Sequence, residues 1–144
     1  YPDHAYVHQG WFTENQRYFY QNDELDELQG KADQTRTLIW DMKDLDNPKL
    51  VKELMLPEKS SDHNLYVKGD MMYQSNYKSG LRILDISDPV NPKEVAHFDT
   101  QPYGKNSPGF QGSWSNYPYF DSGIIVVSSI GEGLFVLQPS QPEL

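Results

Sequence analysis

The feature that most constrains the fold of this chain is an internal repeat. Residues 37–51 (TLIWDMKDLDNPKLV) align without gaps on residues 81–95 (LRILDISDPVNPKEV), 44 positions further along. Seven aligned pairs are identical: Ile39/Ile83, Asp41/Asp85, Asp44/Asp88, Asn47/Asn91, Pro48/Pro92, Lys49/Lys93 and Val51/Val95. A chain that repeats at such a period is built from copies of one supersecondary unit that stack on one another.

The segments that precede these copies repeat as well. Residues 20–23 (YQND), 73–76 (YQSN) and 126–129 (VVSS) follow one another at spacings of 53 residues. A Gly-Leu step follows the last two of them, at residues 80–81 and 133–134, and opens the next strand. Residues 134–139 are then a shortened third copy of the strand that begins at Leu81. The unit therefore occurs about three times, with insertions at residues 25–36 and 101–112.

Each copy has the chemistry of short β-strands separated by turns. Residues 81–86 (LRILDI) are rich in aliphatic residues, and residues 88–92 (DPVNP) contain prolines that cannot donate to a strand ladder. Residues 94–98 (EVAHF) alternate polar and apolar, which predicts a strand with one buried face. Residues 66–73 predict two strands joined by a tight turn at Gly69-Asp70. Only residues 23–29 and 49–56 tolerate a helix.

Repeats of this length made of short strands predict an all-β fold of β-propeller blades, about three four-stranded repeats. The blades occupy residues 1–138, and the Pro-rich residues 139–144 form an exit segment. Propellers close with about 4 to 8 blades. We therefore expect a fragment of a larger propeller, completed either by further blades of the same polypeptide or by other chains. The start lacks Met and a signal peptide, which is typical of a mature or trimmed fragment.

Composition excludes several functional classes. The formal net charge of −9 argues against nucleic-acid binding and against docking on an anionic membrane surface, because both depend on clustered Lys and Arg. No apolar run approaches the roughly 20 residues that a membrane span needs. The chain has no cysteine, which rules out thiol catalysis, disulfides and Cys-type zinc sites.

Two histidines and two acidic residues form a candidate metal site. His8 and His63 each precede a short strand, and Asp23 and Glu24 end the strand into which His8 leads. If these strand ends converge at a propeller channel, all four side chains can surround one divalent cation. Imidazole with carboxylate suits a transition metal, whereas carboxylate with amide oxygens suits calcium. Ordinary hydrogen bonding within the channel explains the same residues without a cation.

Other acidic residues have structural interpretations. The run at residues 23–27 (DELDE) lacks the spacing of an EF-hand loop, and we expect a solvated acidic loop there. The pairs Asp41/Asp44 and Asp85/Asp88 recur with the repeat, which favours a structural role: the first ends a strand and the second caps the turn.

Aromatic and amide side chains near the predicted blade edges are candidates for a ligand-binding surface: Trp11, Asn64, Tyr77 and Trp114. Most large aromatic residues of a sheet protein are nevertheless part of its core. No catalytic set stands out, since the chain has no Gly-x-Ser-x-Gly nucleophile elbow.

Residues 80–95 closely resemble the LVIVD repeat of bacterial and archaeal surface proteins. A longer pattern is similar to the propeller of choice-of-anchor B family proteins, and it includes residues 8–11 (HQGW), 22–27 (NDELDE), 62–66 (DHNLY), 74–77 (QSNY) and 112–117 (GSWSNY). The resemblance implies a propeller displayed outside the cell on an anchor that varies among members. It implies no established enzymatic activity.

The leading hypothesis is a secreted or cell-surface, non-catalytic module for recognition, adhesion or scaffolding. Its partner is another protein or a polysaccharide. One alternative is a metalloenzyme, hydrolase-like, in which a cation at His8, Asp23, Glu24 and His63 activates water. Another alternative is a structural subunit that joins other copies into a ring or filament.

Overall fold

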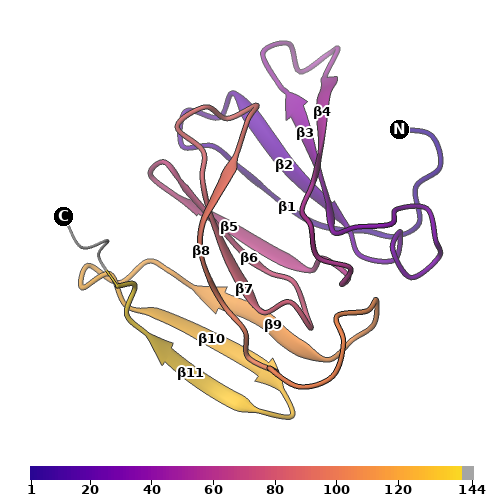
Figure 1. Ribbon diagram of the computed structural model, residues 1–144. Coiled ribbons are helices and arrows are strands. Elements are labelled where there is room, and N and C mark those ends of the chain that lie inside the picture. The colour runs from indigo at the N-terminus through magenta and orange to yellow at the C-terminus, as the bar shows by residue number, and fades with distance from the viewer. Residues whose placement is uncertain (141–144) are drawn as a thin grey trace.

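The computed structural model describes residues 1–140, and over that range the chain forms eleven β-strands in three antiparallel sheets and no helix (Figure 1). Sheet 1 contains β1 (Val7–Phe12), β2 (Tyr18–Asp23), β3 (Arg36–Asp41) and β4 (Lys49–Met55). Sheet 2 contains β5 (Asn64–Lys68), β6 (Met71–Ser75), β7 (Leu81–Asp85) and β8 (Lys93–Phe98). Sheet 3 contains β9 (Gly112–Tyr117), β10 (Ile125–Ile130) and β11 (Gly133–Leu137). The all-β prediction is confirmed. Residues 141–144 of the predicted exit segment lie outside the described residues.

The sequence repeats fall on equivalent strands of the three sheets. The aligned copies correspond to β3, β7 and β11, and the segments before them to β2, β6 and β10. In the ladders, Tyr20 pairs with Ile39 and Tyr73 pairs with Ile83. The first pair is 19 residues apart and the second is 10, so the β2–β3 connection of sheet 1 is nine residues longer. That insertion accounts for the two different repeat spacings, 53 and 44.

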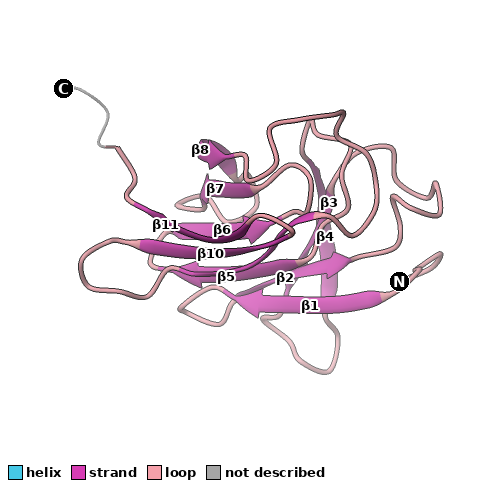
Figure 2. Ribbon diagram, turned by 90° about the horizontal axis from the view of Figure 1, so that it is seen from below, coloured by secondary structure: helices cyan, strands magenta, loops and turns pink. Residues whose placement is uncertain are grey.

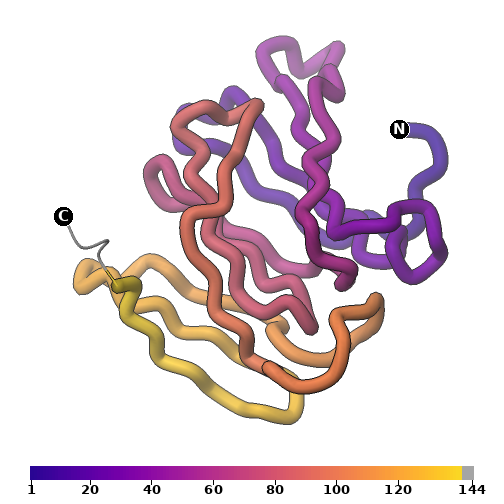
Figure 3. Tube along the Cα trace, in the orientation of Figure 1, coloured from indigo at the N-terminus to yellow at the C-terminus, as the bar shows by residue number. Residues whose placement is uncertain are grey.

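Within each sheet, consecutive strands are neighbours, as in a propeller blade. The first strands lie together: β1 contacts β5, and β5 contacts β9. The sheets fan out from this line of strands (Figure 1), and in the view from below their strands overlap one another (Figure 2). The tube in Figure 3 shows the two predicted insertions as excursions after β2 and before β9. The arrangement is that of propeller-like blades.

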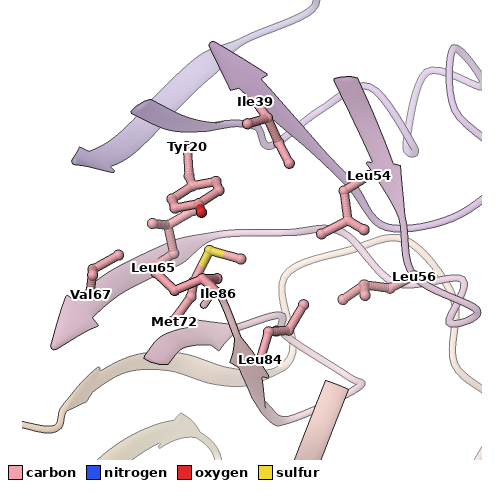
Figure 4. Close-up of a cluster of buried hydrophobic side chains, with 9 residues drawn as sticks. All are labelled: Tyr20, Ile39, Leu54, Leu56, Leu65, Val67, Met72, Leu84 and Ile86. Atoms are coloured by element: carbon pink, nitrogen blue, oxygen red, sulfur yellow. The ribbon is translucent and has the colours of Figure 1, made fainter. Parts of the chain in front are cut away.

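Two apolar clusters hold the sheets together. The larger one fills the space between sheets 1 and 2 (Figure 4); its buried members are Tyr20, Ile39, Leu54, Leu56, Leu65, Val67, Met72, Leu84 and Ile86. The smaller one joins sheets 2 and 3 through Leu81, Ile83, Ile125 and Val127. Strand β7 contributes Leu84 to the first cluster and Ile83 to the second. Its apolar run is therefore explained by burial on both faces.

The repeated aspartates have the structural role predicted for them. Asp41 Oδ1 accepts a hydrogen bond from the backbone N–H of Lys43 (2.9 Å), and Asp85 Oδ1 accepts one from Ser87 (2.8 Å). Asp44 and Asp88 each accept one from the backbone N–H two residues further on. These local bonds are Asx turns, which lead the chain from the third strand to the fourth.

One prediction about an outer strand was wrong. All six residues of β8 are exposed, although residues 94–98 predicted one buried face. This strand is the last of its sheet. It meets sheet 3 at its end, where the ring of Phe98 lies 5.4 Å from that of Phe135 on β11, but its residues stay exposed. Residues 49–55 form β4 and not a helix, because they complete the ladder of sheet 1.

Candidate metal centre at the junction of the three sheets

The side chains between sheets 1 and 2 change from apolar to polar along each strand. Residues two apart on a strand share a face, and the apolar cluster continues into polar residues on five strands: Tyr20 to Asn22, Ile39 to Thr37, Leu65 to His63, Met72 to Gln74 and Leu84 to Arg82. Hydrogen bonds cross the interface at that end, and two of them join residues of these pairs. Asn22 Nδ2 donates to the carbonyl of His63 (3.1 Å), and Gln74 Nε2 donates to Thr37 Oγ1 (2.9 Å). We call these polar residues the polar layer, and we include in it the buried residues Glu24, Asp26, Glu27, Ser60 and Asp62.

His8, Glu24 and His63 meet at the inner edge of the polar layer. His8 lies on β1, Glu24 follows β2, and His63 precedes β5. His8 Nδ1 lies 3.5 Å from Glu24 Oε2, and His63 Nε2 lies 3.7 Å from Glu24 Oε1. One potential ligand atom from each residue lies within 4.8 Å of the other two. The structure thus brings together three of the four residues that the sequence predicted as metal ligands.

The fourth predicted ligand, Asp23, is directed elsewhere. Its carboxylate accepts hydrogen bonds from the Tyr1 hydroxyl, from the Ala5 N–H (2.8 Å) and from the Tyr6 N–H (2.5 Å). These bonds lower the pKa of Asp23 against the opposing effect of burial. The carboxylate is therefore ionised and is already held by three donors. Successive residues of an extended chain point to opposite sides, and Asp23 therefore cannot share the position of Glu24.

His63 has the environment of a metal ligand. Its Nδ1 lies 2.6 Å from the carbonyl oxygen of Trp114, which can accept a hydrogen bond only from a protonated Nδ1. That tautomer leaves a lone pair on Nε2, and Nε2 is buried with no hydrogen-bond partner within residues 1–140. Burial lowers the pKa of His63, which favours the neutral form. Metal-bound histidines are typically oriented in this way by a carbonyl or carboxylate on the second nitrogen.

Tyr77, which follows the second strand of sheet 2, contacts two residues of the same site. Its hydroxyl donates a hydrogen bond to Glu24, and its ring lies 4.8 Å from that of His63. Its backbone has φ of 44°, a left-handed conformation that is costly for a bulky residue. Two hydrogen bonds with the backbone of Ser113 hold it there. A Cβ at Gly112 would lie 2.3 Å from the Tyr77 carbonyl oxygen, so only glycine fits beside this bridge.

One rearrangement is needed before both imidazoles can bind one ion. The rings of His8 and His63 are stacked, with centroids 4.3 Å apart and planes inclined by 19°. Nearly parallel rings cannot both contain the same ion in their planes. The side chain of His63 is 1% exposed, whereas that of His8 is 28% exposed. His8 therefore has the freedom to turn, and His63 with Glu24 forms the fixed part of the site.

Comparison with protein families places sheet 2 in a known repeat class. A family model, the LVIVD repeat, matches residues 61–100, which span all four strands of sheet 2. These residues are therefore similar to the LVIVD repeat. Among curated proteins, none matches the chain. The described residues include no helix with the length and apolar character that a membrane crossing requires.

The matched residues begin at Ser61, and the next residue, Asp62, lies close to the acidic run of sheet 1. The prediction that residues 23–27 form a solvated loop was wrong. Both Asp26 and Glu27 are buried, and each gives one carboxylate oxygen to Arg36: Asp26 Oδ2 to the guanidinium (2.7 Å) and Glu27 Oε1 to the backbone N–H (2.8 Å). Burial, together with the neighbouring carboxylate of Asp26, raises the pKa of Glu27 to about 9. Burial and the carboxylates of Glu27, Asp26 and Asp23 raise the pKa of Asp62 well above its ordinary value.

Three of the four predicted ligand-surface residues are accessible. Trp11 is 40% exposed and Trp114 is 44% exposed, whereas Asn64 is half-buried and donates to the Trp114 carbonyl (3.1 Å). Tyr77 is fully buried and so does not form part of a surface. Further aromatic rings extend the exposed face: Trp11 packs edge-on against Tyr66 of the LVIVD repeat, and Tyr117 packs against Tyr119 and Phe120.

Sequence reasoning missed Tyr77 as part of the site and missed the burial of the acidic run. A signal for the second was present in the strands. Asn22, Thr37 and Gln74 occupy positions that the strand period of two assigns to the same face as buried Tyr20, Ile39 and Met72. Polar residues at three facing positions indicate a buried polar layer, into which the acidic run then folds.

Proposed function

We propose that this protein is an extracellular recognition module of propeller-like blades that binds a divalent transition-metal ion at His8, Glu24 and His63. The observation that carries the metal site is the buried Nε2 of His63, which has no hydrogen-bond partner in the described part of the chain while Nδ1 is held by the Trp114 carbonyl. A lone pair oriented in this way beside a carboxylate and a second imidazole fits a cation.

The donor set favours zinc or a neighbouring transition metal over calcium. Two imidazole nitrogens and one carboxylate are the ligands that such ions take in proteins, whereas calcium takes 6 to 8 oxygens. Because the ligands come from sheets 1 and 2 and the carbonyl that orients His63 comes from sheet 3, an ion at this point would also tie the three sheets together.

Zinc binding tests the site directly. Protein dialysed against a chelator is titrated with Zn²⁺ by calorimetry, and we expect one ion per chain. His63→Ala should weaken binding by more than roughly 100-fold, since even second-shell changes cost about 10- to 100-fold. His97→Ala is the matched control, because His97 is an exposed histidine on β8. Equal loss in the two variants, or no binding to the unmodified protein, would refute the site.

The recognition role is supported by the exposed aromatic face beside the metal site. Trp11, Trp114 and Tyr117 are each at least 40% exposed, and aromatic faces of this kind stack on sugar rings or fill pockets of a partner protein. The resemblance to choice-of-anchor B propellers further favours a position at the cell surface. Polysaccharide is the partner that we propose, with another protein as the alternative.

A polysaccharide array tests this role. We expect binding that Trp11→Ala reduces and that Tyr103→Ala leaves unchanged, since Tyr103 is an exposed aromatic residue in the β8–β9 loop. Repeating the array with chelator separates the two parts of the proposal: binding that survives chelation places recognition on the aromatic face alone. An array without hits, followed by capture of a defined protein that Trp11→Ala abolishes, would assign a protein partner.

A second candidate function is hydrolysis. Three protein ligands leave a coordination position for water, as in catalytic zinc sites, and the partly exposed His8 lies on the accessible side. Zinc-loaded protein assayed on chromogenic esters and phosphoesters should then show turnover that His63→Ala removes. Turnover equal to that of zinc ions alone would exclude this candidate.

A further inference from the structure

Sheets 1 and 2 pack on each other through two rows of residues, each paired across the strands of its sheet. The row of sheet 1 that faces sheet 2 is Trp11, Tyr20, Ile39 and Lys52. The row of sheet 2 that faces sheet 1 is Val67, Met72, Leu84 and Glu94. Five of these residues are buried members of the larger apolar cluster. We call a row that faces the next sheet along the chain a back row, and a row that faces the preceding sheet a front row.

The contact between sheets 2 and 3 repeats this arrangement. Adjacent residues of a strand point to opposite faces, so each sheet has both kinds of row. Ile83 of the back row of sheet 2 is a member of the smaller apolar cluster, and Tyr73 of the same row packs against it. Sheet 3 contributes Ile125 and Leu137, which lie 53 positions after two members of the front row of sheet 2. A back row therefore meets a front row at both internal contacts.

Two rows have no partner sheet within residues 1–140, one at each end of the fan of sheets (Figure 1). The back row of sheet 3 is Tyr117, Val126 and Val136. The front row of sheet 1 is Phe12, Phe19, Trp40 and Leu50. All side chains of both rows are apolar or aromatic, as in the rows that pack inside the chain.

The back row of sheet 3 is open at the position where the equivalent residues are buried. Val136 is 63% exposed, whereas Ile83 and Ile39, at the same position of sheets 2 and 1, are 8% and 0% exposed. Tyr117 is 50% exposed. Burial of the two isoleucines comes from the sheet that follows each of them, and the same cover is absent from sheet 3 within the described residues.

The front row of sheet 1 is open at one end. Phe12 is 36% exposed, whereas the equivalent Val67 of sheet 2 is 3% exposed. The ring of Phe12 lies 4.8 Å from that of Phe19, and the ring of Trp40 has Tyr1 as a neighbour at 6.2 Å. The accessible part of this row is therefore the end formed by the two phenylalanines.

We propose that a second copy of this chain docks the front row of its sheet 1 on the back row of sheet 3. The contact continues the two internal interfaces, because each free row is the repeat equivalent of a row that packs inside the chain. Two copies joined twice in this way form a closed ring of six sheets, within the range of about 4 to 8 blades at which propellers close. A head-to-tail contact that closes gives a ring and not an open filament.

The dimer leaves the sites proposed above in place. Trp11, the equivalent of Tyr117, is 40% exposed although sheet 2 packs against its row, so the aromatic face should remain accessible. None of His8, Glu24 and His63 belongs to either free row. Metal binding and self-association can therefore fail independently of each other.

Sedimentation equilibrium of the unmodified chain tests the proposal. We expect a mass of about twice the 16.7 kDa of one chain. Val136→Glu should weaken association by at least about 100-fold, because it places an unpaired carboxylate in an apolar contact. Val95→Glu is the matched control, since Val95 is 55% exposed on β8 of the middle sheet, and it should leave association unchanged.

A second variant separates the head-to-tail contact from other dimers. Phe12→Glu changes the opposite free row and should weaken association as well. An equal mixture of Val136→Glu and Phe12→Glu should contain more dimer than either variant alone, because one of its two contacts then joins two unchanged rows. If Val136→Glu does not fold, Leu134→Glu takes its place, since Leu134 is 68% exposed on the same face.

Three results would overturn the proposal. The first is an unmodified chain that stays monomeric up to about 1 mM, a concentration at which even weak complexes form. The second is a dimer that Phe12→Glu leaves intact, which would indicate contact between two copies of sheet 3. The third is a mixture of the two variants with no more dimer than its components.

Discussion

The two ends of the interface between sheets 1 and 2 are built on the same five strands and held by different forces. At one end, Leu65, Met72 and Leu84 pack with almost no exposed surface, and the contact is non-directional burial of apolar area. At the other end, two residues along each strand, the facing side chains are polar, and cohesion depends on hydrogen-bond partners and charge balance.

The apolar end holds the two sheets together, whereas the polar end is where a ligand can bind. The apolar end stabilises the fold by close packing, and its side chains offer no group for binding a ligand. A polar end must satisfy each buried atom, and here a histidine nitrogen and several carboxylate oxygens have no partner within residues 1–140. Those atoms make the polar end the place where ligands fit, and they make it less stable when none is bound.

The largest effect is expected from a change at the apolar end. Leu84→Ala removes a fully buried side chain from the centre of the cluster in Figure 4. The free energy of unfolding should fall by about 3 kcal/mol, from lost burial and from the cavity left behind. Urea denaturation measures it, with Leu45→Ala as control because Leu45 is 74% exposed. Similar losses in the two variants would contradict the assigned core.

A smaller effect is expected from the buried hydroxyl at the polar end. Tyr77→Phe leaves the ring in place and removes the hydrogen bond to Glu24. We expect a loss of about 2 kcal/mol in urea denaturation, because the bond is to an acidic side chain that is itself buried. Tyr103→Phe is the matched control, since Tyr103 makes the same type of bond to Glu132 at an exposed site. A change near zero for Tyr77→Phe would show that water replaces the hydroxyl.

The polar end should also make stability depend on pH, which the apolar end cannot do. Glu27 has its pKa raised from 4.5 to about 9, so the folded chain holds a proton that the unfolded chain has lost above pH 4.5. Stability conferred by that proton is therefore lost as pH rises toward 9, by up to about 1.4 kcal/mol per pH unit for one proton. Asp62 acts in the same direction, and His63 acts only near and below pH 6.5.

Melting temperatures measured from pH 7 to 9 in chelator test this dependence. Glu27→Gln mimics the protonated side chain at every pH, so the variant should lose less stability than the unmodified chain over that range. An unchanged slope in the variant would mean that Glu27 is already ionised in the folded protein.

The smallest effect is expected from a neutral hydroxyl of the polar layer. The Ser60 hydroxyl lies 3.0 Å from the Asn76 carbonyl and 2.7 Å from the Ser79 hydroxyl. Ser60→Ala should cost about 1 kcal/mol in the same urea experiment, the value of an ordinary neutral hydrogen bond. Ser107→Ala, in an exposed loop, should be without effect. A larger loss for Ser60→Ala than for Tyr77→Phe would show that hydrogen bonds to acidic groups are not the stronger ones in this layer.

The sequence predicted the elements that depend on local pattern. The repeat located β3, β7 and β11, and Gly69-Asp70 is the turn between β5 and β6. Exposure of β8 was not predictable, because alternation records which face can be buried and not whether another sheet covers it. The burial of residues 23–27 was indicated only indirectly, by the polar residues at facing strand positions, because these charges are buried by residues distant in the sequence.

The candidate site was predictable in part for the same reason. His8 and His63 were placed together by equivalent positions before strands, and Glu24 by the end of β2. Asp23 was included although a strand period of two already separates it from Glu24. Tyr77 was predicted only as part of a ligand surface. Its contact with Glu24 and His63 could not be found from the sequence, because it rests on a left-handed backbone fixed by Ser113, a residue 36 positions away.

The carbonyl of Trp114 that orients His63 comes from a different sheet than either histidine. The complete centre therefore exists only after all three sheets have docked, and partly assembled chains lack it. Ion binding would then stabilise only the fully assembled structure. A higher metal concentration would therefore reduce the population of incomplete assemblies. In the extracellular setting that we propose, such a centre would make complete assembly depend on metal ions from the surroundings.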